Sequence, residues 1–357
     1  MQKPFIWDRY SDQPYPIKDK IYKKKMRKKH LFDYIPLLLT NLVIFPLSIM
    51  LMKFFKAKQI NREEFYGIGV DLDKGEIQVK LIEELGVKHI LIRMPLWEVY
   101  RIEEYVKFAK KFKNQTILLN ILQDREHIEN RELLQRDIKI IFKKFSSFVS
   151  EYQIGNAINR TKWGFFSMGE YLKWYQTIQA IRDKEFPTLK LIGSSVIDFE
   201  YHYTIRTLFN RYSIKYDKFS SLLYVDRRGS PDNTQMGIFD TKNKIDMLYS
   251  LVRLSQKTSN DIYITEVNWP LSNTAPYAPT SEQECVSEER YSRYMTQYFR
   301  TARESNKIKR VYWHQLIASG YGLVDNRDNK IRKTPAFWKF KKNLKALQHL
   351  NNGFCQL

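Results

Sequence analysis

From residue 65 onward, short apolar runs alternate with longer segments in which apolar residues recur three and four positions apart. The runs are rich in Val, Ile, Leu and aromatic residues, which is typical of buried parallel strands, and the longer segments have helical periodicity. The predicted strands cover residues 65–72, 88–96, 116–123, 152–158, 190–198, 219–226, 261–269 and 310–317, and predicted helices include 102–112, 132–149, 168–184, 244–255, 288–304 and 335–347. Eight such repeats predict an α/β fold, a single (β/α)8 TIM barrel over residues 65–347, in preference to a doubly wound open sheet.

A different pattern precedes the predicted barrel. Residues 34–52 contain no charged side chain and closely follow a basic run at residues 23–29. Since about 20 apolar residues cross a bilayer, residues 31–56 are predicted to be a helical membrane anchor, with residues 1–30 as a basic tail and 348–357 as a C-terminal tail. Pro36 and Pro46 lie within the run, so a monotopic or re-entrant insertion and a buried soluble helix stay open as alternatives. The run starts too deep in the chain for a cleaved signal peptide.

The charge is strongly positive and uneven. The chain has a formal net charge of +21, and residues 1–30 hold ten Lys or Arg against three Asp. This bias favours an anionic membrane surface or an anionic polymer as partner. Nucleic acid is not expected, because no nucleic-acid-binding motif accompanies the basic residues. The cations before the apolar run favour a cytoplasmic N-terminus and a barrel on the extracytoplasmic side of the inner membrane. The oligomeric state is not indicated.

Cysteine and histidine give no sign of a metal centre. Cys285 and Cys355 are too few for a disulfide framework and lack metal-ligand spacing, and His202 and His314 have no partner at such a spacing. We therefore expect neither a metal nor a cofactor.

The carboxyl ends of barrel strands point into one shared pocket, so the residues there are the candidate site. In strand order they are Asp71, Asp73, Arg93, Trp97, Asn120, Gln123, Asn156, Asn159, Asp198, Tyr224, Asp226, Glu266, Trp269, Trp313, His314 and Gln315. Aromatic faces, amides and a few carboxylates are typical of a carbohydrate site. Arg160 and Lys162 follow the fourth strand, and Arg227 and Arg228 follow the sixth, where they would suit an anionic ligand.

With these residues the chain resembles the retaining glycoside hydrolases of clan A. That group consists of (β/α)8 barrels with an Arg on the second strand, Asn-Glu ending the fourth, Glu ending the seventh and often a Trp on the eighth. The matching residues are Ile90-Leu91-Ile92-Arg93, Ile154-Gly155-Asn156, Ile264-Thr265-Glu266 and Val311-Tyr312-Trp313. The resemblance implies that Glu266 is the nucleophile and that Arg93 holds it ionised. It also implies that Asn156 binds the sugar 2-hydroxyl and that Trp313 forms the floor of the subsite.

One position departs from that pattern, because Ala157 stands where the clan has its acid/base glutamate. Retaining hydrolysis uses two carboxyl groups about 5 to 5.5 Å apart, and losing general acid catalysis typically costs about 10² to 10⁴ in rate. Three explanations stay open: Asp198 or Asp226 supplies the proton, the substrate needs no protonation or assists itself, or the fourth strand has another register. We favour Asp198.

The first hypothesis is therefore a membrane-anchored, glycoside-hydrolase-like enzyme that acts on an envelope polysaccharide or glycolipid, with Glu266 as nucleophile. The alternative is a catalytically inactive, glycan-binding barrel in surface polysaccharide assembly or export. A third hypothesis is a scaffold recruited to lipid by the basic tail. Structural interpretations of single residues also stay open, such as a buried Glu266–Arg93 ion pair and core positions for Trp97 and Trp313.

Overall fold

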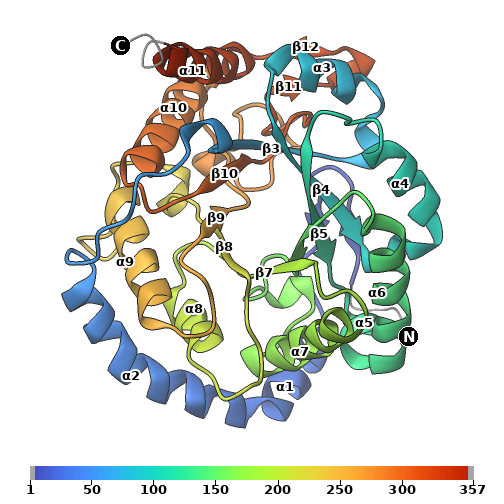
Figure 1. Ribbon diagram of the computed structural model, residues 1–357, viewed down its shortest axis with the longest axis vertical. Coiled ribbons are helices and arrows are strands. Elements are labelled where there is room, and N and C mark those ends of the chain that lie inside the picture. Colours follow the sequence, from blue (N-terminus) through green and yellow to red (C-terminus); the bar gives the residue numbers. More distant parts are fainter. Residues whose placement is uncertain (1–4, 353–357) are drawn as a thin grey trace.

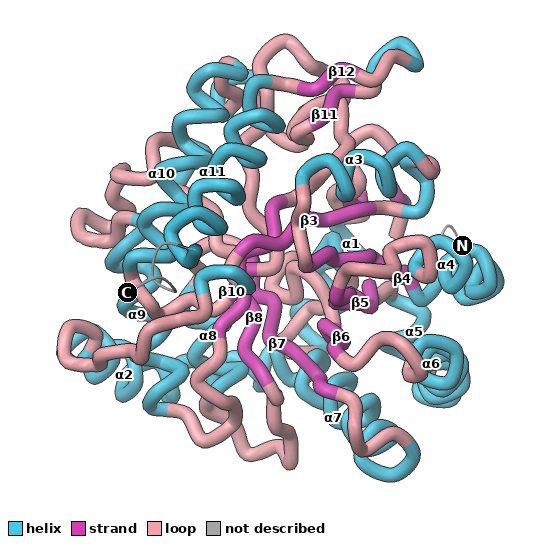
Figure 2. Tube along the Cα trace, turned by 45° about the horizontal axis from the view of Figure 1, so that its top comes forward, coloured by secondary structure: helices cyan, strands magenta, loops and turns pink. Residues whose placement is uncertain are grey.

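The computed structural model describes residues 5–352, and its centre is a closed barrel of eight parallel strands. Figure 1 shows the strands at the middle of a ring of helices, and Figure 2 shows the same arrangement after a turn of 45°. The barrel strands are β3 (Tyr66–Val70), β4 (His89–Pro95), β5 (Thr116–Leu122), β6 (Glu151–Ile154), β7 (Lys190–Ile197), β8 (Lys218–Leu222), β9 (Ile262–Ile264) and β10 (Arg310–Trp313). The predicted TIM barrel and all eight predicted strands are confirmed.

Each strand pairs in parallel with the next along the chain, and β10 closes the barrel against β3 through Val311 opposite Tyr66. The buried apolar residues form two clusters. The large one includes the strand residues packed against the helices, and the small one consists of Leu91, Leu118, Ile192, Tyr263 and Tyr312. Gly67 is required at this point, because a Cβ there would lie 2.4 Å from the Tyr312 ring. All strands run in one direction, so their carboxyl ends form one rim.

Nine helices follow the strands in the described part of the chain, and six of them match the predicted segments in position, with shifted ends. They are α3 (Ile77–Leu85), α4 (Ile102–Ala109), α5 (Arg125–Glu129), α6 (Arg131–Phe145), α7 (Met168–Glu185), α8 (Tyr201–Leu208), α9 (Thr241–Leu254), α10 (Glu288–Glu304) and α11 (Pro335–Asn352). The sequence did not predict α3, α5 and α8, which have nine residues or fewer. Residues 348–352 continue α11, which corrects the predicted C-terminal tail, and residues 353–357 lie outside the described part of the chain.

The N-terminal segment is folded onto the barrel, which corrects its description as a separate basic tail. A short hairpin of β1 (Trp7–Asp8) and β2 (Gln13–Pro14) lies at the mouth, where the Arg93 guanidinium donates to the Asp12 carbonyl oxygen over 3.0 Å. Helix α1 (Lys20–Lys29) and helix α2 (Tyr34–Leu51) follow. The strand pair β11 (Val324–Asp325) and β12 (Arg332–Lys333) lies near the other chain end.

Helix α2 lies against the outside of the barrel. Figure 1 shows it as a blue arc beyond α8 and α9, with α1 next to it. The apolar segment Leu31–Leu51 is long and apolar enough to cross a membrane, as the sequence predicted, and only 11% of its most apolar window is buried inside the protein. The buried soluble helix, one of the alternatives, is therefore not what the structure shows.

Candidate active site

Glu266 lies two residues beyond the end of β9 and is held by side chains from β4 and from the segments that follow β6 and β8. Its Oε2 accepts hydrogen bonds from the Arg93 guanidinium at 2.5 Å and from the Asn156 amide at 3.3 Å, and its Oε1 accepts one from the Tyr224 hydroxyl at 2.8 Å. The structure thus brings together Glu266, Arg93, Asn156 and Tyr224, as the sequence predicted. No other carboxyl group bonds to Glu266 within the described residues.

The electrostatics keep Glu266 ionised. Burial alone would raise its pKa, but His314, Arg93, Tyr224 and Asn156 outweigh burial and lower the pKa to about 2. Burial and Arg93 lower the pKa of His314 to about 3, so this imidazole is neutral near pH 7. Arg93 is therefore the cation that stabilises the Glu266 carboxylate at neutral pH. The ionised carboxylate is the form that a nucleophile requires.

Amide side chains fix the orientation of Asn156. Its Oδ1 accepts from the Asn120 amide at 3.1 Å, while its backbone carbonyl and N–H bond to the Gln123 amide at 2.7 and 2.9 Å. All of these groups are buried. Because its Oδ1 is occupied, the Asn156 amide nitrogen is left to donate to Glu266, and Asn156 itself lies beneath the carboxylate and does not line the cavity.

A cavity of about 170 Å³ opens beside Glu266. It is smaller than the roughly 300 to 1,000 Å³ of most ligand sites. Its lining residues are Ser11, Asp12, Gln13, Arg93, Arg160, Lys162, Trp163, Ile197, Asp198, Tyr224, Arg228, Glu266, Asn268, Pro279, Thr280, His314 and Tyr321. Arg160 and Asp198 therefore line the pocket, as predicted.

The sequence did not predict that the N-terminal hairpin forms one wall of this cavity. The Asp12 carboxylate accepts from the Tyr321 hydroxyl at 2.9 Å and the Gln315 amide at 3.0 Å, and Lys74 lies 3.1 Å away. The Gln13 side chain bonds to Lys162 at 2.6 Å. The only hint was composition: residues 5–16 alternate aromatic residues, proline and aspartate, which is unusual for a solvated basic tail.

Ala157 is fully buried and has a backbone φ of +45°. It offers no acid, and the nearest expected substitute, Asp198, is held by cations. The Asp198 carboxylate lies 2.5 Å from Arg160, and its other oxygen is 4.0 Å from Arg228. Asp226 lies at the rim in a neighbouring pocket, together with Asp198.

Several predicted sugar-binding residues lie elsewhere. Trp313 and Trp269 are fully buried and stack on each other at 5.9 Å, and the Trp313 indole donates to the Tyr291 hydroxyl at 2.7 Å. They belong to the layer between barrel and helices, which corrects their expected place in the pocket. The Asn159 amide donates hydrogen bonds to the Glu200 carboxylate at 2.7 Å and to the Ile197 carbonyl, away from the cavity.

Trp97 also lies outside the Glu266 cavity. It packs against the N-terminal aromatics, with ring centroids 5.0 Å from Phe5 and 5.3 Å from Trp7, and lines an adjacent apolar cavity of about 440 Å³. The sequence did not predict that N-terminal residues cover Trp97, so it could not predict the contacts of this ring.

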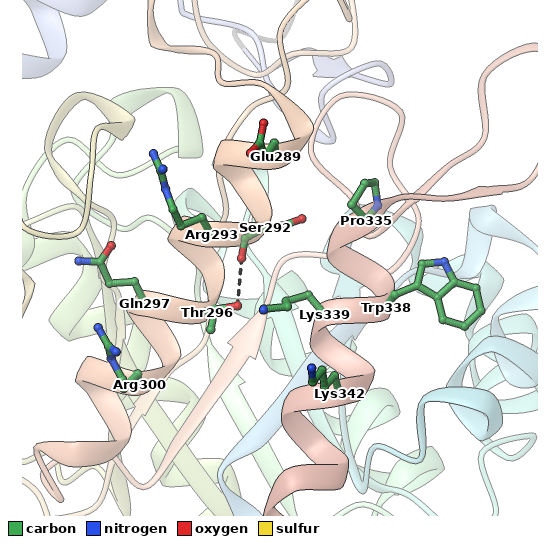
Figure 3. A pocket seen from close by; sticks show the side chains of 10 residues that line it. All are labelled: Glu289, Ser292, Arg293, Thr296, Gln297, Arg300, Pro335, Trp338, Lys339 and Lys342. Carbon is green, nitrogen blue, oxygen red and sulfur yellow. Dashed lines mark hydrogen bonds between the residues drawn. The ribbon is translucent and has the colours of Figure 1, made fainter.

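A larger groove, of about 750 Å³, lies on the flank between α10 and α11 and is shown in Figure 3. Arg293, Arg300, Lys339 and Lys342 line it, and Glu289 is its one carboxylate. It lies away from the strand ends and has no pair of carboxyl groups, so the cavity beside Glu266 remains the candidate active site.

The structure is a closed (β/α)8 barrel with a buried carboxylate, Glu266, beyond the carboxyl end of one strand. No family model and no curated protein matches the sequence. Solved structures match it: a rice β-glucosidase, Os3BGlu6, at 9% identity and a TM-score of 0.60, covering 79% of this chain and 98% of that one. A GH39 enzyme from Xanthomonas axonopodis pv. citri matches at 11% identity and a TM-score of 0.56, covering 82% and 68%.

A GH2 β-galacturonidase from Eisenbergiella tayi matches at 14% identity with a TM-score of 0.54. The match covers 81% of this chain, but the chain spans only about half of the galacturonidase, 51%. At these identities the likeness establishes the shared barrel fold.

Proposed function

We propose that the protein is a glycoside-hydrolase-like enzyme in which Glu266 is the nucleophile. The observation that carries the proposal is the ionised carboxylate at the barrel mouth, bonded to Arg93, Asn156 and Tyr224. A buried carboxylate with a lowered pKa attacks an anomeric carbon without first losing a proton. Arg93, Tyr224 and Asn156 keep it in place.

The proton donor is proposed separately, because Ala157 supplies none. Asp198 lines the same cavity and is our first candidate, which would make the acid/base arrangement unlike that of the clan. Its carboxylate is engaged in an ion pair with Arg160. This contact, with the buried Ala157, supports the second candidate function: a glycan-binding barrel without hydrolysis, acting in surface polysaccharide assembly or export.

The ligand is proposed to be an anionic envelope polysaccharide or glycolipid. Lys162 lines the cavity, bonds to the neutral Gln13 amide and makes no ion pair with any described residue. Arg228 also faces the cavity, and its buried Nη1 has no hydrogen-bond partner in the described structure. A uronate or phosphate group on a sugar would satisfy both cations. The apolar segment before the barrel favours a substrate at a membrane.

The test is turnover of activated aryl glycosides, comparing neutral sugars with the corresponding uronides. The enzyme proposal would be supported if Glu266→Gln abolished hydrolysis while it retained sugar affinity. Lys162→Met should weaken binding of the uronides at least tenfold and leave the neutral sugars unchanged, with Lys330→Met, an exposed lysine that does not line the cavity, as the matched control.

If the parent protein turns over none of these glycosides, the enzyme proposal fails. Saturable uronide binding that Lys162→Met weakens would then support the glycan-binding alternative. If sugars neither turn over nor bind, both candidate functions are refuted.

A further inference from the structure

The two faces of helix α2 differ in character. The face on the barrel contains the polar residues: the Asn41 amide donates to the His202 carbonyl at 3.1 Å, and the Ser250 hydroxyl donates to the Ser48 carbonyl at 3.0 Å. The Phe45 ring stacks on Tyr201 at 4.1 Å. The side chains of this inner face recur three or four positions apart from Leu37 to Met52, which fixes one side of the helix to α8 and α9.

The opposite face is apolar and exposed. Its residues are Ile35, Leu38, Leu39, Leu42, Val43 and Met50, and Leu42 exposes 72% of its surface. They also recur at helical spacing, so they form one stripe along the helix. Helices on the surface of soluble proteins normally turn polar residues outward, and α2 does the reverse. A contiguous apolar stripe of this kind marks a contact surface.

Both chain segments that flank α2 are bound to the barrel. Upstream, Asp12 and Gln13 are bonded to barrel residues at the mouth. Downstream, Lys53 pairs with Asp246 at 2.7 Å, and the chain enters β3 at Tyr66. A helix that crosses a bilayer leaves its two flanks on opposite sides. If α2 crossed, residues 5–19 and the barrel would lie on opposite sides, and the contacts of Asp12 and Gln13 at the mouth would be broken.

Cations lie beside the apolar stripe. Helix α1 carries Lys20, Lys23, Lys24, Lys25, Arg27, Lys28 and Lys29, and none of them makes an ion pair with a described residue. Figure 1 shows α1 directly preceding α2 along the same edge of the molecule. Basic residues next to an exposed apolar helix face are typical of helices that lie in the interface of an anionic bilayer.

We infer that α1 and α2 dock the protein onto one face of an anionic lipid bilayer, with α2 lying in the plane of the membrane and not crossing it. The outer stripe enters the boundary between headgroups and acyl chains, and α1 binds anionic headgroups. The N-terminal residues and the barrel stay on the same side, which differs from the topology that the charge distribution favoured. This inference does not depend on whether the barrel hydrolyses glycosides.

The first test is topology in cells. Two single-cysteine variants of the full chain, Lys18→Cys and Lys330→Cys, are made with Cys285 and Cys355 replaced by Ser. A membrane-impermeant maleimide is applied to intact and to opened cells. The inference predicts that both positions react only on the same side. Reaction on opposite sides, or a mature protein that begins after residue 52, would overturn it.

The second test is partition of the purified protein onto vesicles of phosphatidylcholine with and without 30% phosphatidylglycerol. Leu39→Glu with Leu42→Glu should lower partition at least tenfold, whereas Ile331→Glu, which charges another exposed apolar residue, should leave it unchanged. Lys24→Glu with Lys28→Glu should remove the preference for phosphatidylglycerol. These exposed side chains leave the inner face of α2 intact, and thermal melting verifies that each variant is folded.

Binding that ignores the Leu39 and Leu42 substitutions would refute docking through this face. A dimer in solution that these substitutions dissociate, without vesicle binding by the parent protein, would show that a second copy covers the stripe and would equally overturn the inference.

Discussion

Replacing Glu266 by Gln tests the electrostatic description of the site through stability, whatever the activity proves to be. The pKa of Glu266 is lowered from 4.5 to about 2 in the folded protein. At about 1.36 kcal/mol per unit, the ionised carboxylate contributes at most about 3 kcal/mol to the free energy of unfolding near pH 7, because His314, the largest cause of the lowering, is neutral at that pH. Breaking a buried ion pair by removing one partner costs about 3 to 5 kcal/mol, which agrees with that value.

The sign of the pH dependence follows from the direction of the shift. A carboxyl group with a lowered folded pKa stabilises the fold above its unfolded pKa, and this contribution is lost as the pH falls toward the folded value. The parent protein should therefore exceed Glu266→Gln in stability by up to about 3 kcal/mol at pH 7 and by no more than about 1 to 1.5 kcal/mol at pH 3. Urea unfolding followed by tryptophan fluorescence at both pH values measures the difference.

Glu132→Gln is the matched control, because Glu132 is exposed and pairs with no described cation. It should change stability by less than about 0.5 kcal/mol at either pH. A Glu266→Gln variant as stable as the parent at pH 7, or a difference that does not shrink at pH 3, would contradict the assignment of Arg93 as the partner that holds Glu266 ionised.

Three further predictions concern neighbouring groups. Burial and Asp12 raise the pKa of the partly buried Asp71 to about 6, so its charge destabilises the fold as the pH rises from 4 to above 6. In thermal melts, Asp71→Asn should stabilise the protein by about 1 to 2 kcal/mol at pH 8 and hardly at pH 4. Equal effects at both pH values would refute the raised pKa. Burial lowers the pKa of His89 and His314 to about 3, so their ring resonances should not titrate between pH 5 and 8 in NMR spectra that contain imidazole as reference; a midpoint near 6.5 would count against it. Trp313→Phe should lower the free energy of unfolding by about 1 to 3 kcal/mol and leave sugar affinity intact, whereas Tyr224→Phe should weaken that affinity. Titration calorimetry measures the affinities, and the reverse outcome would show that Trp313 belongs to the sugar site.

The barrel was predictable because each strand is a continuous apolar run bounded by helical periodicity, a signal local to each repeat. Glu266, Arg93, Asn156 and Tyr224 were predictable because parallel strands bring their carboxyl ends to one rim. Position at a strand end does not determine which way a large ring turns, so Trp313 and Trp269 were misplaced. They lie in the core layer, where indoles fill space between strands and helices.

The N-terminal hairpin could not be predicted for a different reason. Its contacts join residues 303 and 309 positions apart, from Asp12 to Gln315 and Tyr321. No periodicity in the sequence reports a pairing of that range, and the surrounding charge made the segment look like a solvated tail. The structure alone places Asp12 and Gln13 at the cavity.

That hairpin has a practical consequence for anyone who prepares the protein. Removing an apolar N-terminal helix to obtain a soluble enzyme is common practice, and here a truncation before Tyr66 would also delete Ser11, Asp12 and Gln13 from the cavity wall. Arg93 would lose its bond to the Asp12 carbonyl, and Lys162 would lose Gln13. A shortened protein without activity would therefore say nothing about the full-length protein, so assays belong on the full chain in detergent or lipid.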